Sequence, residues 1–344
     1  MQTKHSDQRL VSVVIPAFNA ADTIAMTIDS LRKQTYPSIE IIVVNDGSTD
    51  GTEDVLADFE PEVHVISLTN QGIAVARGAG MLKARGAYIA WLDSDDICDP
   101  NSIAYRVAIL EARPDVALVS TAFESFDASS SRPDVTLETY YSNINRRAHG
   151  VADLYPEEAK AIVEGTTVPY RVGNLYLPLF EGNVIHPPTV MFRREAFEQH
   201  GFPDPGYFVP DPDYFIRIAR FGLCAVIPLP LLRYRLSPDQ VSSARNRNRL
   251  QADSLRCIDA MINADPALRK THPEMIRRRF GHVYASSVAV FADDNKWWAF
   301  RCLVKALRYG RAPDFSSIVR LFLPTSGISL IRKLKARKRE VRSA

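Results

Sequence analysis

The first 120 residues alternate short apolar runs with segments whose apolar residues recur at helical spacing. The runs are rich in β-branched residues and span residues 11–15, 39–44, 63–68, 88–92 and 116–120. Between them, Ile24, Ile28 and Leu31 follow the i, i+4, i+7 pattern, with Asp22 at the N-cap position, and residues 50–59 and 72–84 also favour helices. Strands apolar on both faces and separated by helices predict an α/β fold with a mostly parallel sheet flanked by helices, Rossmann-like in layout.

The rest of the chain indicates two further regions. Residues 124–182 show no clear period, and we interpret them as an insertion or acceptor region with some helix around 155–164. An apolar strand at 225–232 follows, and residues 250–264, 273–291 and 297–309 have helical spacing without strand-like alternation. We therefore expect one domain over 1–243 and a C-terminal helical subdomain over 244–344.

The composition excludes several classes of protein. With 46% hydrophobic and 24% charged residues, the chain is not disordered as a whole. It contains no run of eighteen apolar residues, and residues 1–10 lack the apolar core of a signal peptide, so we expect neither a spanning helix nor export. The four cysteines form no Cys-x-x-Cys pair, which disfavours a disulfide framework or a zinc module and fits a reducing cytosol.

The near-neutral charge of +2 conceals a split along the chain. The last 44 residues hold twelve basic and two acidic residues, a net +10, whereas the first 300 carry −8. From residue 318 onward, cations and apolar residues interleave, which is typical of an amphipathic helix on an anionic membrane. A solvated basic helix face explains the same pattern. No nucleic-acid-binding motif is present, and we expect no nucleic-acid partner.

Unusual polar residues follow the predicted strands, at the edge where ligands bind in such sheets. Asn19 follows the first strand, and Asp46 and Ser48 follow the second, just before a helix. Asp46 and Ser48 are also common N-cap residues, so capping of that helix stays open. Arg77, on the first turns of the third helix, is expected to face the same crevice.

Three acids, Asp93, Asp95 and Asp96, come directly after the fourth strand. Clustered carboxylates repel one another unless a cation neutralises them, and hard oxygen donors suit Mg²⁺ or Mn²⁺. An N-cap cluster for a helix near Pro100 is the simpler alternative, although Asp99 alone would supply that cap. Later, Asp211 and Asp213 precede an amphipathic helix, where capping again competes with a role in chemistry.

Together these motifs resemble the inverting family 2 glycosyltransferases of the GT-A fold, such as those of bacterial polysaccharide and cell-envelope synthesis. The matching segments, in order, are VSVVIPAFNA, VVNDGSTDGT, NQGIAVARGAG, WLDSDD and PDPDYFIRIAR. The resemblance covers about residues 10–243 and is weak over 124–182.

The resemblance implies a set of site residues. Nucleotide contacts fall to Pro16, Ala17, Asn19, Asp46 (to the uracil ring), Arg77, Asp93 (near the ribose) and Ser94. Asp93 and Asp95 form the Asp-x-Asp pair that binds Mn²⁺ or Mg²⁺, and Asp211 stands at the position of the catalytic base. Two departures are notable: Pro210 replaces the usual Glu before that base and, with Pro212, implies a stiff loop, and Ser237 replaces a common His.

The implied activity is metal-dependent transfer of a sugar, with inversion, from a nucleotide-sugar donor (most fittingly a UDP-sugar) to a hydroxyl of a glycan or lipid-linked acceptor. Such acceptors are made at the inner face of the cell membrane, which favours a cytoplasmic protein attached peripherally through its basic tail. A non-catalytic sugar-nucleotide binder of the same fold remains an alternative because of Pro210 and Ser237. A nucleotidyltransferase is less favoured because no Gly-rich phosphate loop follows the first strand.

Overall fold

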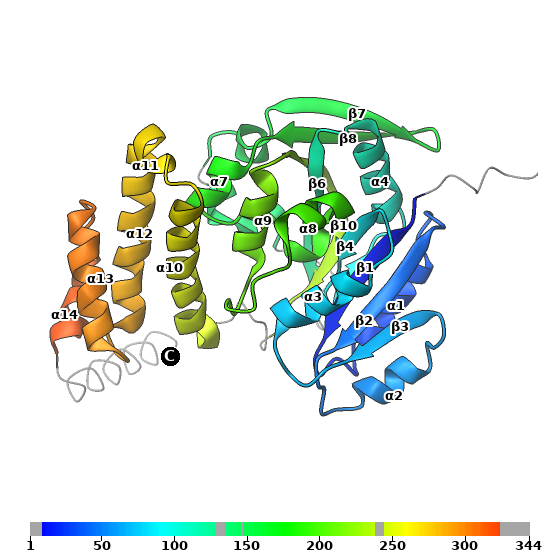
Figure 1. Cartoon of the computed structure of the whole chain (residues 1–344), viewed down its shortest axis with the longest axis horizontal. Coiled ribbons are helices and arrows are strands. Elements are labelled where there is room, and N and C mark those ends of the chain that lie inside the picture. The colour runs from blue at the N-terminus through cyan, green and yellow to red at the C-terminus, as the bar shows by residue number, and fades with distance from the viewer. Residues whose placement is uncertain (1–8, 128–134, 146, 238–243, 324–344) are drawn as a thin grey trace, which may run out of the picture. The chain divides into compact units, whose positions relative to one another are not determined.

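The structure is a computed structural model that describes residues 9–127, 135–145, 147–237 and 244–323. The chain divides into two compact units, residues 1–240 and 241–344. The first unit combines a sheet with helices, and the described part of the second unit is helical (Figure 1).

The described residues of the first unit form one ten-stranded sheet in the order β3-β2-β1-β4-β9-β6-β10-β8-β7, with β5 paired to β10. The pairs β1/β2, β2/β3, β1/β4 and β6/β10 are parallel. The strands are β1 (Val11–Ala17), β2 (Ile39–Asn45), β3 (Val63–Ser67), β4 (Tyr88–Trp91), β5 (Ile97–Cys98), β6 (Val116–Phe126), β7 (Glu157–Val163), β8 (Thr166–Gly173), β9 (Met191–Arg193) and β10 (Leu223–Arg235).

Helices connect and cover these strands, as expected for an α/β fold. They are α1 (Ile24–Arg32), α2 (Thr52–Ala57), α3 (Ile73–Lys83), α4 (Ser102–Ala112), α5 (Leu137–Tyr140), α6 (Ser142–Asn145), α7 (Tyr176–Glu181), α8 (Arg194–His200) and α9 (Asp211–Ala219), with 3-10 turns at Gly150–Asp153 and Pro187–Thr189. The predicted α/β fold is confirmed, with parallel pairing among β1 to β4 and between β6 and β10, whereas β5, β7, β8 and β9 pair antiparallel with their neighbours.

The core lies where the first strands pack against α3. Every residue of β1 is buried, which explains why its sequence lacks the alternation of a half-exposed strand. Gly80 of α3 packs directly on the sheet, and a Cβ atom there would lie 2.4 Å from Val14 Cγ1. A glycine at this position therefore brings the start of α3, which carries Arg77, close to the strand ends.

The helix expected around residues 155–164 is wrong. β7 and β8 form an antiparallel hairpin along the top of Figure 1, joined at Glu164 and Gly165, which both have positive φ. Val168, Tyr170 and Val172 are buried on alternate positions of β8, and this period of two outweighs the helical propensity of the Glu, Ala and Lys residues in β7.

The expected cap at Asp22 is wrong, and the alternative of a cap at the Asp93–Asp96 cluster does not occur. The N-cap of α1 is Thr23 rather than Asp22, and its side chain makes no capping hydrogen bond. The Asp93–Asp96 cluster does not cap the next helix, because α4 begins at Ser102 with Asn101 at its N-cap. Asp99 Oδ1 accepts a hydrogen bond from the Asn101 N–H at 2.9 Å, so it orders the approach to this helix.

The second unit packs its helices side by side. They are α10 (Arg247–Ala264), α11 (Leu268–Thr271), α12 (Pro273–Phe291), α13 (Lys296–Arg308) and α14 (Phe315–Phe322), preceded by a 3-10 turn at Ala244–Asn246. The three long helices agree with the predicted ones. Among the described residues, no helix has both the length and the apolar character needed to cross a membrane. The basic tail from Pro324 onward lies outside the described residues.

The close approach of α3 to β1 yields a stability prediction. Gly80→Ala adds a methyl group with no room and is expected to lower the free energy of unfolding, because overpacking costs about 1–3 kcal/mol against a helix-propensity gain of about 1 kcal/mol. Gly78→Ala is the matched control on the same helix, since its Cβ would meet Phe202 at an ordinary 3.7 Å. In urea denaturation, Gly78→Ala should have a higher free energy of unfolding than Gly80→Ala. The reverse order would contradict the close packing of Gly80 on β1.

Candidate functional site

The candidate site lies at the carboxyl ends of three neighbouring parallel strands. β2, β1 and β4 are adjacent in the sheet and end at Asn45, Ala17 and Trp91. Because neighbouring parallel strands end at the same edge of the sheet, Asp46, Asn19 and Asp93 all lie near that edge. This is the edge at which α/β sheets bind ligands. The first turn of α9 adds Asp211 from a distant part of the chain.

The guanidinium of Arg77 joins the two carboxylates of this site. Its Nη2 donates to Asp93 Oδ1 at 2.9 Å, and its Nη1 donates to Asp211 Oδ1 in a short ion pair. The Arg77 side chain is only 1% exposed, so the expected open crevice position is replaced by a buried one. Its Nε has no hydrogen-bond partner within the described residues. Arg77 therefore fixes the distance between the helix α9 carboxylate and the turn after β4.

Aromatic rings enclose this ion-pair network. The Arg77 guanidinium carbon lies 4.5 Å from the centre of the Trp91 ring, in reach of a cation–π interaction. Trp91 also stacks on Tyr214 of α9, with ring centres 5.2 Å apart, and meets Phe192 edge-on at 5.5 Å. These contacts exclude water from one side of the network, which strengthens the ion pairs.

Asp211 is the first residue of α9 and is buried. Pro210 is the N-cap and Pro212 lies in the first turn, where proline is tolerated because its missing N–H has no partner in a helix anyway. The expected stiff loop is thus a helix start. Burial raises the pKa of Asp211 to about 6 and outweighs the opposite effect of the Arg77 charge. The carboxylate is still ionised at neutral pH.

The acids after β4 occupy different environments. Asp93 is partly exposed, and burial together with the Asp93 charge raises the pKa of Asp95 to about 6. Asp96 is fully buried, and its Oδ1 accepts a hydrogen bond from the Arg235 N–H at 2.9 Å. Ser94 is half-buried in the same turn. Asp93 and Asp95 are therefore the pair that remains for a ligand.

This pair fits a divalent cation in charge and donor type. Burial and the Asp93 charge raise the pKa of Asp95, so a cation beside this pair would be favourable, and Mg²⁺ or Mn²⁺ commonly takes its other ligands from phosphate and water. Within the described part of the chain, no three His, Cys, Asp or Glu side chains gather to hold a metal ion by themselves. Ser237 is half-buried and lies two residues after the end of β10.

Asp46 is buried at the end of β2 and accepts two backbone hydrogen bonds from the segment before α3. The Gln71 N–H donates to its Oδ1 at 2.9 Å, and the Gly72 N–H donates to its Oδ2 at 2.7 Å. Gly47 has φ +72°, and a Cβ there would lie 2.6 Å from the Asn70 nitrogen, so glycine allows this approach. Asp46 does not cap α2, the alternative that its position in the sequence left open. Its carboxylate orders the start of α3, the helix that carries Arg77.

The turns after β1 and β2 are tied together by side chains. The Asn19 N–H donates to Ser48 Oγ at 2.9 Å, and the Thr49 N–H donates to Asn19 Oδ1 at 2.8 Å. Asn19 has φ +51°, a left-handed conformation that asparagine tolerates well. Pro16 and Ala17 are buried within β1, and the Ala17 carbonyl oxygen accepts a hydrogen bond from the Asp46 N–H at 2.8 Å. Ser48 thus binds the neighbouring turn rather than capping α2.

Asp213, for which capping was the simpler interpretation, instead pairs with Arg217 one turn later. The distance between Arg217 Nε and Asp213 Oδ2 is 3.0 Å. The N-cap of α9 has no side-chain capping bond. Asp213 thus orders the helix surface, whereas Asp211 points into the ion-pair network.

His186 is buried among aromatic rings, and its position in the sequence suggested a structural role or an acceptor contact without these partners. His186 stacks on Phe123 at 4.1 Å and meets Tyr234 edge-on at 4.5 Å, and its Nδ1 lies 3.1 Å from the Tyr141 hydroxyl. Burial, aided by the Arg77 charge, lowers the pKa of His186 to about 3, so the ring is neutral. The position of His186 before two prolines carried no periodic signal that would have revealed these contacts.

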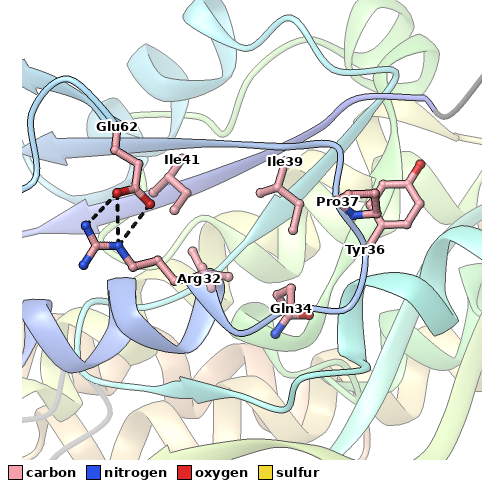
Figure 2. A pocket seen from close by; sticks show the side chains of 8 residues that line it. Arg32, Gln34, Tyr36, Pro37, Ile39, Ile41 and Glu62 are labelled. Carbon is pink, nitrogen blue, oxygen red and sulfur yellow. Dashed lines mark hydrogen bonds and ion pairs between the residues drawn. The ribbon is translucent and has the colours of Figure 1, made fainter. Parts of the chain in front are cut away.

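A surface hollow of about 210 Å³ lies away from these residues (Figure 2). It is lined by the end of α1 and the start of β2, including Tyr36, Ile39 and Ile41. Its one cation, Arg32, is bound to Glu62 at 2.6 Å, as the dashed lines in Figure 2 show. Because it adjoins the amino end of β2, it is remote from the strand ends that carry the carboxylates.

The family model for glycosyl transferase family 2 matches residues 12–201, more than half of the chain and the part that holds the strand-end residues. The chain belongs to glycosyl transferase family 2. This assignment confirms the resemblance seen in the sequence and makes the protein a glycosyltransferase. It also decides against the nucleotidyltransferase alternative.

Relatives and solved structures agree with this assignment. An uncharacterized glycosyltransferase of Rickettsia prowazekii is 29% identical over 289 residues, which cover 83% of this chain and 80% of the relative. TarS residues 1–349 of Staphylococcus aureus, in complex with UDP-GlcNAc, match with a TM-score of 0.52 at 13% identity over 87% of this chain and 89% of that one. The mannosyltransferase PcManGT of Pyrobaculum calidifontis, in complex with GDP-Man and Mn²⁺, matches at 0.51 and 20%, over 88% and 81%. At these identities the structures support the shared fold.

The buried network predicts a large effect of Arg77. Arg77→Gln leaves Asp211 buried without its cation and is expected to lower the free energy of unfolding by about 3 kcal/mol in urea denaturation. Arg32→Gln is the matched control, because Arg32 also pairs with two acids and lies over a ring, Phe59, but is 39% exposed. Its stability should stay near that of the unmodified protein. Equal losses in both variants would refute the special role of burial.

Proposed function

We propose that this glycosyltransferase moves a sugar from a nucleotide-sugar donor, most fittingly a UDP-sugar, to a hydroxyl of a glycan or lipid-linked acceptor with inversion. The observation that carries the proposal is the Arg77 bridge, which holds Asp211 beside Asp93 at the strand-end edge. The TarS structure with UDP-GlcNAc supports a uridine donor, and the PcManGT structure with GDP-Man makes a guanosine donor the alternative.

The donor is proposed to lie across the ends of β1, β2 and β4. Asp46 uses one lone pair of each oxygen for backbone N–H groups, and a carboxylate has others with which to accept a hydrogen bond from a uracil ring. Asn19, at the exposed turn after β1, and the main chain of Pro16 and Ala17 would contact the nucleotide. Arg77 holds the carboxylates in place, so we assign its share in donor binding to positioning rather than to direct contact.

Asp93 and Asp95, with Ser94 between them, are proposed to bind the donor's ribose and diphosphate side. Mn²⁺ or Mg²⁺ held there would offset the charge that develops on the diphosphate as it leaves. The chain's own contribution is the geometry and the local charge: Arg77 orients Asp93, and burial beside the Asp93 charge makes a cation favourable at Asp95.

Asp211 is proposed as the catalytic base. The acceptor hydroxyl oxygen attacks the anomeric carbon, the bond from that carbon to the diphosphate oxygen breaks with its electron pair, and the carboxylate takes the hydroxyl proton. One base on the face opposite the leaving group gives inversion in a single displacement. The ion pair with Arg77 uses Oδ1, so we assign the proton to Oδ2, the other oxygen of the carboxylate.

The place of action is proposed to be the cytoplasmic face of an anionic membrane. The charge of the C-terminal residues supports it, because seven basic residues and one acid follow Leu323.

The base assignment predicts the outcome of one substitution. With a UDP-sugar, Mn²⁺ and an acceptor present, Asp211→Asn should lower the rate of UDP release about a hundredfold or more. Nucleotide binding should persist. Asp213→Asn, two residues along the same helix turn, is the matched control and should retain turnover. Because the carboxylate must be ionised to take a proton, kcat/KM should fall as the pH drops below about 6.

The same assay separates turnover from mere binding. Nucleotide binding without UDP release by the unmodified protein, across several donors and envelope acceptors, would favour the non-catalytic binder. An unchanged rate of UDP release by the Asp211→Asn variant would show that Asp211 is not the catalytic base.

A further inference from the structure

Two consecutive helices of the second unit expose apolar side chains on one face each. On α13, the uncovered residues Trp297, Phe300, Val304 and Leu307 follow one another at spacings of three and four. Trp297 is 68% exposed, whereas Ala299, Cys302 and Leu303 of the same helix are buried. A stripe at this spacing lies along one side of a helix, opposite the side that packs into the unit.

The next helix repeats this arrangement. On α14, Phe315 and Phe322 are seven residues apart and are 81% and 65% exposed, while Ser317 and Leu321 face the interior. Ile318 and Val319 are half-buried between them. We call the exposed residues of α13 and α14 the aromatic face; it comprises Trp297, Phe300, Val304, Leu307, Phe315 and Phe322.

Positive charge accompanies the aromatic face. Residues 296–323 include six basic residues and one acid, Asp314. That acid is engaged as the N-cap of α14, where it accepts a hydrogen bond from the Ser317 N–H at 3.0 Å. On α13, Arg301 lies 5.5 Å from the ring centres of both Trp297 and Trp298. The positive charge of Arg301 therefore lies next to the two tryptophan rings.

We infer that the aromatic face inserts into the interface of an anionic bilayer. Helices lying in that interface bury an apolar stripe to about 5–10 Å and place Lys and Arg against lipid phosphates, with Trp at the headgroup level. Exposed Arg301 and Arg308 flank the stripe on α13 and supply those cations. This inference deepens the proposed membrane location, on which it rests, and assigns lipid contact to helices rather than to the tail alone.

Charge argues against two other partners for the aromatic face, a second copy of the chain and the chain's own C-terminal residues. A second copy of the same face would bring two net-positive surfaces together, which is repulsive. The residues after Leu323 are also strongly basic, so they do not neutralise Arg301 and Arg308. Lipid phosphate supplies the missing negative charge, and the acyl region takes the aromatic rings.

The chain contains its own probe of insertion. Its three tryptophans are Trp91, which is buried in the first unit, Trp297 on the aromatic face, and Trp298, the next residue of α13. Titrating the full chain with phosphatidylcholine vesicles containing roughly one-third phosphatidylglycerol should shift tryptophan emission to shorter wavelength, and brominated acyl chains should quench it. Pure phosphatidylcholine vesicles should produce a much smaller change.

Substitutions separate the aromatic face from the tail. Phe315→Ser with Phe322→Ser should lower partitioning onto the anionic vesicles at least tenfold, since two large apolar side chains no longer leave water. Leu82→Ser with Ile162→Ser is the matched control, because each of these residues is 67% exposed in the first unit. A variant with the seven basic tail residues replaced by Gln should bind more weakly yet still show the emission shift at low salt.

Three outcomes would overturn the inference. Vesicle binding without any emission shift or quenching would leave the tail as an electrostatic anchor and exclude insertion of the face. An emission shift that depends on protein concentration without lipid would indicate self-association. Equal partitioning of the Phe and the control variants would show that α14 does not contact lipid. Donor turnover is measured without vesicles, so its failure is distinguishable from each of these.

Discussion

The guanidinium of Arg77 lies between Asp93 and Asp211, side chains that reach it from the turn after β4 and from α9. Burying one charge alone would be costly, whereas the three charges offset one another over the face of Trp91. The network can form only when α3, β4 and α9 are packed together. The base and the donor-side carboxylate therefore share one positioning group, and the assembly of the site is tied to the folding of the first unit.

The first four strands could be predicted from the sequence because strands buried on both faces appear as uninterrupted apolar runs. β1, β2, β3 and β4 lie within one or two residues of their expected ends, and the long helices α10, α12 and α13 agree with the 3.6-residue period. The β7–β8 hairpin was not predicted, because the Glu, Ala and Lys residues of β7 favour a helix locally. Its strand conformation comes from pairing with β8, a tertiary effect that a local pattern does not contain.

The site was predictable as a set of residue types and only partly as contacts. Strand ends located Asp46 and Asp93 correctly, because parallel strands end at one edge. The pairing of Arg77 with Asp211, 134 residues along the chain, follows from the packing of α9 and has no sequence signal. The neutral His186 among aromatic rings was hidden for the same reason. Local patterns indicate what a residue can do, and packing decides which partner it meets.

The coupling between Arg77 and Asp211 tests this account most directly. A double-mutant cycle would compare the loss of unfolding free energy caused by Asp211→Asn alone with its loss in the Arg77→Gln background. A buried ion pair predicts that Asp211→Asn costs much less once Arg77 is gone, with a coupling energy of about 1–3 kcal/mol. Losses that add within about 0.3 kcal/mol would show that the two side chains act independently, and would contradict a site built around Arg77.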